Sequence, residues 1–184
     1  MEGGRPMDAY PGRLVKTLNA LAASSMLAIA ITGVAQAADA PTSIATALTA
    51  TDPATGGAVA LDPASGPMHV VFIATWCRPC LAEIPKLADL EDRWKADGYR
   101  LFLVAVATRQ TPERLKELMA QGPLPGKLVF DANGSVASAF GASTIPTQAL
   151  VDRHGRIVAR SGALDPAFSE AVERLVRQEG RAKP

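Results

Sequence analysis

Apolar runs and amphipathic stretches alternate along the chain from about residue 67 to residue 180. The apolar runs are typical of strands in a largely buried sheet: 69–74, 100–107, 127–130, 148–151 and 156–161. The stretches between and after them repeat apolar residues at spacings of three and four, as amphipathic helices do: 81–94, 112–120, 135–140 and 166–180. This alternation predicts one α/β domain, in which helices flank a central mixed sheet.

Local signals set the ends of these elements. Thr111-Pro112 is an N-cap followed by a proline at the first helical position, and Asp165-Pro166 opens the last helix in the same way. Pro85 falls inside the 81–94 stretch, where it should kink the helix. The turn 152–155 is short enough to make the last two strands antiparallel neighbours.

Residues 38–66 differ in composition, since they are rich in Ala, Thr, Gly and Pro. The short apolar runs 44–49 and 58–61 flank the turn-forming segment 52–57. They predict a small β-hairpin at one edge of the sheet. We therefore expect an N-terminal extension over 38–66 and the main domain over 67–180.

The N-terminal 37 residues have the pattern of a signal peptide. Arg13 and Lys16 precede an uncharged stretch that ends in the small-residue triplet Ala35-Gln36-Ala37. Polar residues interrupt the stretch, which weakens the alternative of a retained anchor that contacts the membrane through residues 14–38. Met7 is an alternative start. The prediction is an exported protein.

Charge and composition exclude several classes of partner. With 48% hydrophobic and 20% charged residues, the chain has the composition of a globular protein. Residues 1–37 hold three of the 19 basic and two of the 18 acidic residues, so the remainder carries equal numbers of both signs. A neutral surface gives no electrostatic reason to expect nucleic acid or anionic lipid as a partner.

Candidate chemistry lies at the junction of the first apolar run and the helix that follows it. The segment Trp76-Cys77-Arg78-Pro79-Cys80 contains both cysteines of the chain. A disulfide across so short a loop removes little entropy from the unfolded state, so stability is a poor reason for the pair. At a helix N-terminus a thiolate is favoured, which points to reversible redox chemistry. Arg78 either assists the thiolate or is an ordinary exposed side chain.

The structural alternatives for the cysteine pair are two small buried hydrophobic residues or half of a metal site. A tetrahedral zinc site needs two further ligands, and the chain has only two histidines. His69 starts an apolar run and His154 falls in a turn, so nothing brings them to the cysteines. We expect no metal, and we assign both histidines a structural role.

These motifs together resemble a known family. Trp-Cys-x-x-Cys at a strand-helix junction, and Ile145-Pro146-Thr147 before a hairpin, resemble the thioredoxin fold. The signal peptide, the extra hairpin, the spacing from Cys80 to Glu83 and Pro85, and the ending 146–155 are similar to the TlpA/ResA branch of exported thiol-disulfide oxidoreductases. The resemblance covers about residues 42–178.

The resemblance implies roles for the cysteine pair and the loops beside it. Cys77 would attack a client disulfide, and the less accessible Cys80 would resolve the mixed disulfide. Pro146 would be a cis proline, and its loop with Ile145 would offer a backbone edge to the client. Trp76 would flank the disulfide and contact the client.

The chain departs from thioredoxins at the buried acid. Thioredoxins carry an aspartate six positions before the first cysteine, where this chain has Val71. Glu83 matches an acidic residue that, in ResA-like proteins, adjusts the thiol pKa values or relays protons. The alternative is that Glu83 is a solvated helix residue.

The resemblance implies a periplasmic thiol-disulfide oxidoreductase that reduces protein disulfides, as in cytochrome c maturation. It would need no cofactor. Its partners would be a client protein with a disulfide or dithiol and an upstream membrane electron donor, and we expect a monomer. Two alternatives are a thiol peroxidase-like antioxidant and a non-enzymatic metal-carrying or binding module. Peroxidases usually carry Thr/Ser-x-x-Cys and an activating arginine, which the segment 74–77 does not clearly provide.

Overall fold

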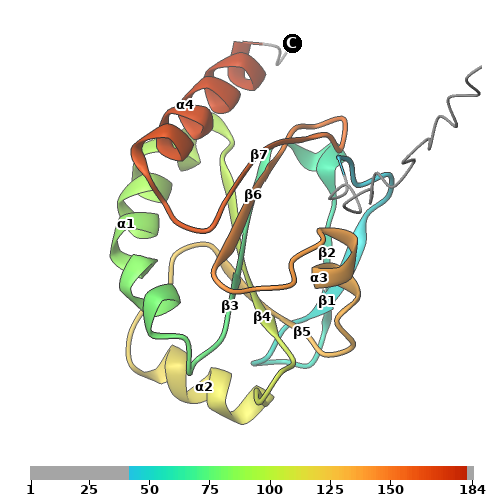
Figure 1. Ribbon diagram of the computed structural model, residues 1–184, viewed down its shortest axis with the longest axis vertical. Helices are drawn as coiled ribbons and strands as arrows, with labels where there is room; N and C mark the ends of the chain where they lie inside the picture. The colour runs from blue at the N-terminus through green and yellow to red at the C-terminus, as the bar shows by residue number, and fades with distance from the viewer. Residues whose placement is uncertain (1–41, 182–184) are drawn as a thin grey trace, which may run out of the picture. The chain divides into compact units, whose positions relative to one another are not determined.

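The computed structural model describes residues 42–181, so the predicted signal peptide and its alternative as an anchor lie outside the described residues. A seven-stranded mixed sheet, in the order β2-β1-β5-β4-β3-β6-β7, forms the centre of this part of the chain (Figure 1). The predicted fold class, a mixed sheet with flanking helices and an N-terminal hairpin, is confirmed.

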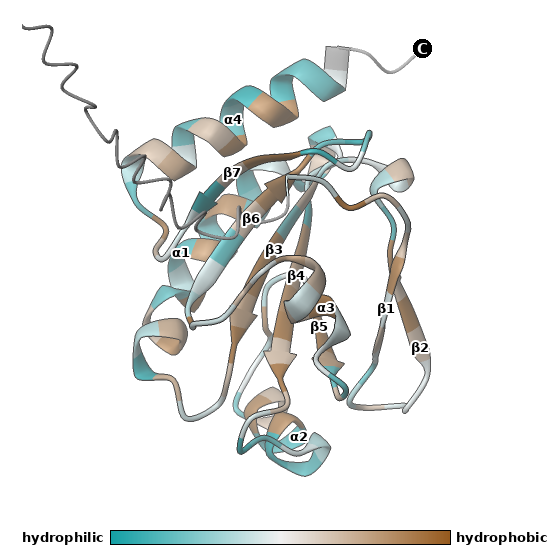
Figure 2. Cartoon of the chain, turned by 45° about the vertical axis from the view of Figure 1, so that its right-hand side comes forward, coloured by the Kyte–Doolittle hydropathy of each residue, from teal (hydrophilic) through white to brown (hydrophobic). Residues whose placement is uncertain are grey.

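The middle of the sheet is built from parallel strands that are buried on both faces. They are β3 (Met68–Ile73), β4 (Arg100–Val106) and β5 (Lys127–Asp131). Strand β6 (Thr147–Val151) pairs antiparallel with β3, and β7 (Ile157–Ser161) pairs antiparallel with β6. The apolar colouring of the central strands in Figure 2 agrees with their burial. Each predicted strand here is confirmed to within one or two residues.

The N-terminal hairpin consists of β1 (Leu48–Thr51) and β2 (Ala58–Leu61) at one edge of the sheet. The prediction of a strand over 44–49 is wrong in its start. Ile44 donates its backbone N–H to the Gly155 carbonyl oxygen at 2.7 Å, which attaches this segment to the β6–β7 turn instead. Gly155 has a φ of 79°, and a Cβ there would collide with the Ile44 carbonyl oxygen, so the close approach requires glycine.

The helices lie on both faces of the sheet (Figure 1). Helices α1 (Arg78–Trp94) and α4 (Pro166–Arg181) cover one face, and α3 (Ser135–Ala139) covers the other. Helix α2 (Pro112–Ala120) follows β4, and Thr111 caps it as predicted, since its Oγ1 accepts from the Arg114 N–H at 3.4 Å. Two short 3-10 helices are Pro63–Ser65 and Lys95–Asp97.

Helix α1 positions the cysteine pair. It begins at Arg78, three residues before the predicted apolar stripe, and Pro79 lies in its first turn, where a missing N–H is harmless. Pro85 lies inside the helix, as predicted. The buried face is formed by Cys80, Glu83, Leu87, Leu90 and Trp94. Leu81 and Ile84, which the periodicity placed in this stripe, are half-buried.

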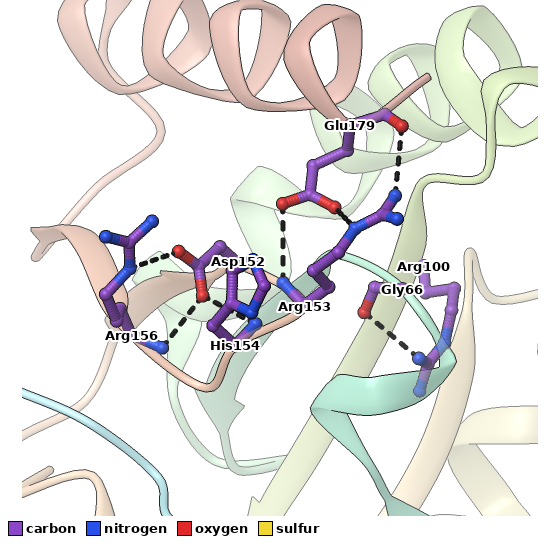
Figure 3. Close-up of polar contacts among 7 residues, drawn as sticks. All are labelled: Gly66, Arg100, Asp152, Arg153, His154, Arg156 and Glu179. Atoms are coloured by element: carbon purple, nitrogen blue, oxygen red, sulfur yellow. Dashed lines mark hydrogen bonds and ion pairs between the residues drawn. The ribbon is translucent and has the colours of Figure 1, made fainter. Parts of the chain in front are cut away.

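A cluster of polar side chains lies at the β6–β7 turn (Figure 3). The Asp152 carboxylate accepts from the backbone N–H groups of His154 and Arg156 at 2.9 Å and from Arg156 Nε at 2.6 Å. Arg153 forms an ion pair with Glu179 of α4. These contacts hold the predicted turn together. Among residues 42–181, none of the helices has the length and apolar character needed to cross a membrane.

Candidate redox site

Cys77 and Cys80 form a disulfide at the N-terminus of α1. Cys77 is the N-cap of the helix: its backbone N–H donates to the Ala74 carbonyl oxygen at 3.0 Å, and its Sγ accepts from the Cys80 N–H at 3.3 Å. Both residues are buried, Cys77 with 5% and Cys80 with 1% of its surface exposed. Cys77 is therefore the more exposed residue of the pair by a small margin.

This geometry favours a thiolate on Cys77 once the disulfide is reduced. The unpaired N–H groups and the dipole of the first helical turn stabilise a negative charge at the N-cap, and the Cys80 N–H already points at the Cys77 sulfur. Arg78 is exposed between the two cysteines, so solvent screens its charge.

The β4–α2 loop, residues 107–111, holds the segment just before Cys77. The Trp76 indole N–H donates to the Thr108 carbonyl oxygen at 2.9 Å, and the Arg109 guanidinium lies 4.5 Å from the centre of the indole ring. The Gln110 side-chain oxygen accepts from the Thr75 backbone N–H at 2.9 Å and from its hydroxyl at 3.0 Å. The site therefore includes a loop that the sequence motifs did not indicate.

Backbone strain accompanies this loop. Arg109 has a φ of 52°, in the left-handed region that a non-glycine residue rarely adopts. The conformation brings the guanidinium over Trp76 while Gln110 reaches Thr75. The amide nitrogen of Gln110 is buried without a partner among the described residues. The strained backbone and the unpaired amide are unfavourable for the loop, but its contacts hold Thr75 and Trp76 in place directly before Cys77.

The loop that contains Ile145 and Pro146 is the next part of the site. The Ile145–Pro146 peptide bond is cis, which confirms the geometry that the resemblance implies. Ile145 packs against the hydrophobic cluster that contains both cysteines. Ile145 and Trp76 line a cleft of about 590 Å³, together with residues 106–108, 131–134, 137 and 142–144. Trp76 is 39% exposed, so part of its ring is open to solvent beside this cleft.

Glu83 is buried, with 8% of its surface exposed, so its interpretation as a solvated helix residue is wrong. One carboxylate oxygen accepts from the Leu164 backbone N–H at 2.8 Å, and the other from the Gln148 side-chain N–H at 2.7 Å. Gln148 is the β6 partner of Val71, the position of the missing thioredoxin aspartate. Glu83 therefore brings an acid to the sheet beside that position, from the helix rather than from the strand.

Two further buried groups lie behind Gln148. The Gln148 side-chain oxygen is 2.8 Å from His69 Nε2, and His69 Nδ1 is 2.5 Å from the Tyr99 hydroxyl. Burial lowers the pKa of His69 from 6.5 to about 4, although its bond to Gln148 acts in the opposite direction. Burial raises the pKa of Tyr99 well above its usual value. Both ring nitrogens of His69 are thus bonded in the core, whereas His154 is exposed in its turn.

The sequence motifs missed Gln148, Tyr99 and Gln110. A signal existed for Gln148, because a glutamine inside an apolar strand segment needs a buried partner. The same holds for His69 at the start of β3. No local pattern marks Tyr99 or Gln110. Within residues 42–181, no group of three or more His, Cys, Asp or Glu side chains is placed to hold a metal ion.

Fold and site together define a thioredoxin-like domain with a disulfide-forming cysteine pair at a strand-helix junction. Residues 40–160 match the AhpC/TSA family, and the chain belongs to this family. The thiol-disulfide oxidoreductase ResA of Bacillus thuringiensis subsp. konkukian is 28% identical over 87 residues, which are 47% of this chain and 49% of the relative. The chain thus spans about half the length of the curated relatives that it matches, and these relatives confirm the resemblance to ResA.

Solved structures agree with the fold. The thioredoxin domain of a thiol-disulfide oxidoreductase from Bacteroides vulgatus is 26% identical, with a TM-score of 0.63, and the match covers 74% of this chain and 98% of that one. A thiol:disulfide interchange protein from Chlorobium tepidum is 23% identical, with a TM-score of 0.62, covering 76% and 99% of the two chains. The second likeness bears on the fold alone.

Proposed function

We propose that the protein is an exported thiol-disulfide oxidoreductase that reduces disulfides of client proteins through Cys77 and Cys80. The observation that carries this proposal is the disulfide at the N-cap of α1, with the Cys80 N–H directed at the Cys77 sulfur. The ResA relatives support the same activity.

The reaction begins with the reduced protein. The Cys77 thiolate attacks one sulfur of the client disulfide, which forms a mixed disulfide and releases the first client sulfur as a thiolate. Cys80 then loses its proton and attacks the Cys77 sulfur. The Cys77–Cys80 disulfide forms and the second client thiolate leaves. Two electrons pass to the client, which takes up two protons, and a donor dithiol must reduce the protein again.

Glu83 is the proposed proton partner of Cys80. It lies one turn further along the same buried face of α1, and each of its two oxygens keeps a lone pair beyond the bond it already accepts. In this role it replaces the acid that thioredoxins carry at the position of Val71. If Glu83→Gln left both thiol titrations and the exchange rate unchanged, Glu83 would have no part in the chemistry.

The client is proposed to bind across Trp76 and the cis-proline loop. An extended segment can pair with the backbone beside Ile145 and Pro146, while one of its side chains enters the 590 Å³ cleft that Ile145 and Trp76 line. Such a site recognises backbone and a single side chain, which suits proteins as clients. The resemblance to ResA suggests clients that take part in cytochrome c maturation.

We also propose that residues 1–37 direct export and are removed, that 38–66 are an extension and that 67–180 form the exchange domain. The upstream donor would then be a membrane protein that supplies electrons to a monomer in the periplasm. Mass spectrometry of the protein recovered from a periplasmic extract tests this part. Export with cleavage gives a chain beginning near Ala38, whereas a retained anchor leaves the full mass in the membrane fraction.

Insulin reduction by the full chain, driven by dithiothreitol, tests the activity. The unaltered protein should accelerate precipitation of the insulin B chain, and Cys77→Ser and Cys80→Ser should each abolish turnover. Undiminished turnover in either variant would reject the mechanism. Stoichiometric copper or zinc binding without turnover would favour a metal carrier, and rapid peroxide consumption would favour a peroxidase.

The reduction potential of the cysteine pair tests the direction of electron flow. A value near that of thioredoxin, about −270 mV, fits a reductant, and a value near about −120 mV fits an oxidant. Equilibration of the full chain with glutathione buffers, followed by alkylation and mass spectrometry, gives this value.

A further inference from the structure

Four polar side chains form a continuous hydrogen-bonded chain in the core between the sheet and helices α1 and α4. They are Tyr99, His69, Gln148 and Glu83, here called the Glu83 chain. The contacts along it measure 2.5 Å, 2.8 Å and 2.7 Å. The Phe168 ring of α4 lies 5.1 Å from the His69 ring. Only Glu83 has a part in the proposed exchange reaction, so the other three require an explanation.

The direction of every hydrogen bond in the Glu83 chain follows from its carboxylate end. A carboxylate only accepts, so Gln148 must turn its NH₂ group toward Glu83 and its oxygen toward His69. His69 Nε2 must then carry a proton and donate to that oxygen. Nδ1 is left bare and accepts from the Tyr99 hydroxyl. Four residues from different elements therefore share one donor direction, from Tyr99 to Glu83.

The Glu83 chain also fixes the position and the orientation of the Glu83 carboxylate. The Gln148 NH₂ group holds one oxygen and the Leu164 backbone N–H holds the other, so the carboxylate can neither rotate nor withdraw without breaking a buried bond. His69 prevents rotation of the Gln148 amide, because a rotated amide would place its NH₂ group against the Nε2 proton. The Tyr99 hydroxyl donates to Nδ1 and so stabilises the His69 tautomer that opposes this rotation.

We propose that Gln148, His69 and Tyr99 are positioning residues for the exchange reaction, which hold the Glu83 carboxylate in one orientation one helical turn from Cys80. This inference rests on the proposed function, in which Glu83 exchanges a proton with Cys80. A movement of the carboxylate changes both its distance from Cys80 and the electrostatic field that it produces at the Cys80 sulfur. The positioning residues should therefore alter the thiol titrations without touching a cysteine.

The first test measures the pH dependence of iodoacetamide alkylation of the reduced full chain. Gln148→Met keeps the length of the side chain but removes its donor. We expect it to move the alkylation midpoints in the same direction as Glu83→Gln, by between half and all of that shift. The double variant should move them no further than Glu83→Gln alone, because both changes act through one carboxylate. Tyr99→Phe should give a smaller shift of the same sign.

Val172→Ala is the control for general destabilisation. Val172 is fully buried on α4 in the same hydrophobic cluster, and its truncation leaves a cavity without touching a polar group. It should lower stability and leave the alkylation midpoints unchanged. Additive shifts in the double variant, no shift in Gln148→Met, or no shift in Glu83→Gln would each overturn the inference. Insulin turnover by the unaltered protein judges the exchange activity separately, so the two failures are distinguishable.

The second test reads the direction of the Glu83 chain from the ¹⁵N resonances of the imidazole rings. In the unaltered protein His69 should carry its proton on Nε2. In Glu83→Gln the new NH₂ group faces Gln148, the Gln148 amide rotates, and the His69 proton should move to Nδ1. His154, the other histidine of the chain and exposed, provides an internal control that should not respond. A His69 tautomer that is the same in both proteins would contradict the coupling.

Discussion

Two buried carboxylates lie near opposite ends of strand β6 and are held by different kinds of contact. Asp152 follows the strand and is bonded by donors two and four residues away (Figure 3). Glu83 lies beside Gln148 in β6 and is bonded by donors 65 and 81 residues away. The first carboxylate closes a turn, and the second links a helix, a strand and a loop beside the cysteines.

The difference suggests how to distinguish a carboxylate that stabilises a turn from one that takes part in the proposed exchange reaction. A local network such as that of Asp152 satisfies backbone groups of its own turn, so its loss is felt in stability. A non-local network such as the Glu83 chain orders groups that could have been apolar. We therefore expect the Glu83 chain to affect the thiol titrations more than the stability of the fold. The following predictions test this division.

The largest effect is expected in the pH dependence of the free energy of unfolding, through His69 of the Glu83 chain. Because burial lowers the His69 pKa from 6.5 to about 4, the folded state favours the neutral ring. The contribution of neutral His69 to the free energy of unfolding is fully present above pH 6.5, and it is lost as the pH falls toward 4. It corresponds to about 3 kcal/mol at 1.36 kcal/mol per pKa unit.

Urea unfolding at pH 7 and pH 4 measures that contribution. Between these two values, the free energy of unfolding of the unaltered protein should fall by about 3 kcal/mol more than that of His69→Gln, which cannot titrate at this position. Other acidic groups titrate in both proteins and cancel in the difference. An equal fall in the two proteins would show that His69 is not held neutral by the fold.

Asp152→Ala should lower the free energy of unfolding by about 2 kcal/mol, because it removes the acceptor of two backbone N–H groups and of Arg156. The alkylation midpoints of the reduced cysteines should not move. Denaturant unfolding and alkylation of the same preparation check both statements. A shifted midpoint would mean that the two carboxylates do not divide their roles as described.

Glu179→Gln should cost less, about 1 kcal/mol or below, although its carboxylate pairs with Arg153 of the same turn. The Arg153 side chain remains one-third exposed, so water replaces part of the lost interaction, and its bond to the Glu179 backbone carbonyl oxygen is retained. Thermal unfolding of this variant beside Asp152→Ala ranks the two contacts. A larger loss for Glu179→Gln would reverse that ranking.

Glu83→Gln should change stability least, since the whole Glu83 chain can reverse its donor direction and keep its bonds. The expected loss in the free energy of unfolding is below about 1 kcal/mol. The thiol titrations should nevertheless shift. This variant and Asp152→Ala thus form a matched pair with opposite outcomes, measured by unfolding and by alkylation. A loss of several kcal/mol in Glu83→Gln would assign the Glu83 chain to stability.

Most elements could be predicted because their signals are local. Thr111 and Pro112 set the start of α2, and the turn after Val151 sets the β6–β7 hairpin. The first strand was placed too early because Ile44 looks like a strand residue, whereas its partner is the distant Gly155.

The site was predictable where chemistry depends on spacing and not where it depends on tertiary contacts. The cysteine pair follows from a motif, and the cis Pro146 follows from the family resemblance. The buried bond of Glu83 depends instead on Gln148, which β6 places against α1. Gln110 reaches Thr75 through a strained loop that has no sequence signature. Contacts such as these, between residues far apart in the chain, leave no local pattern from which they could be predicted.

The central claim, exchange through an attacking Cys77 and a resolving Cys80, is tested most directly by trapping the mixed disulfide. The reduced full chain with Cys80→Ser is mixed with a peptide that contains one disulfide, quenched with acid and analysed by mass spectrometry. The account predicts one peptide joined to Cys77 in this variant and no stable adduct in Cys77→Ser. An adduct that accumulates on Cys80 in Cys77→Ser, with none on Cys77, would contradict it.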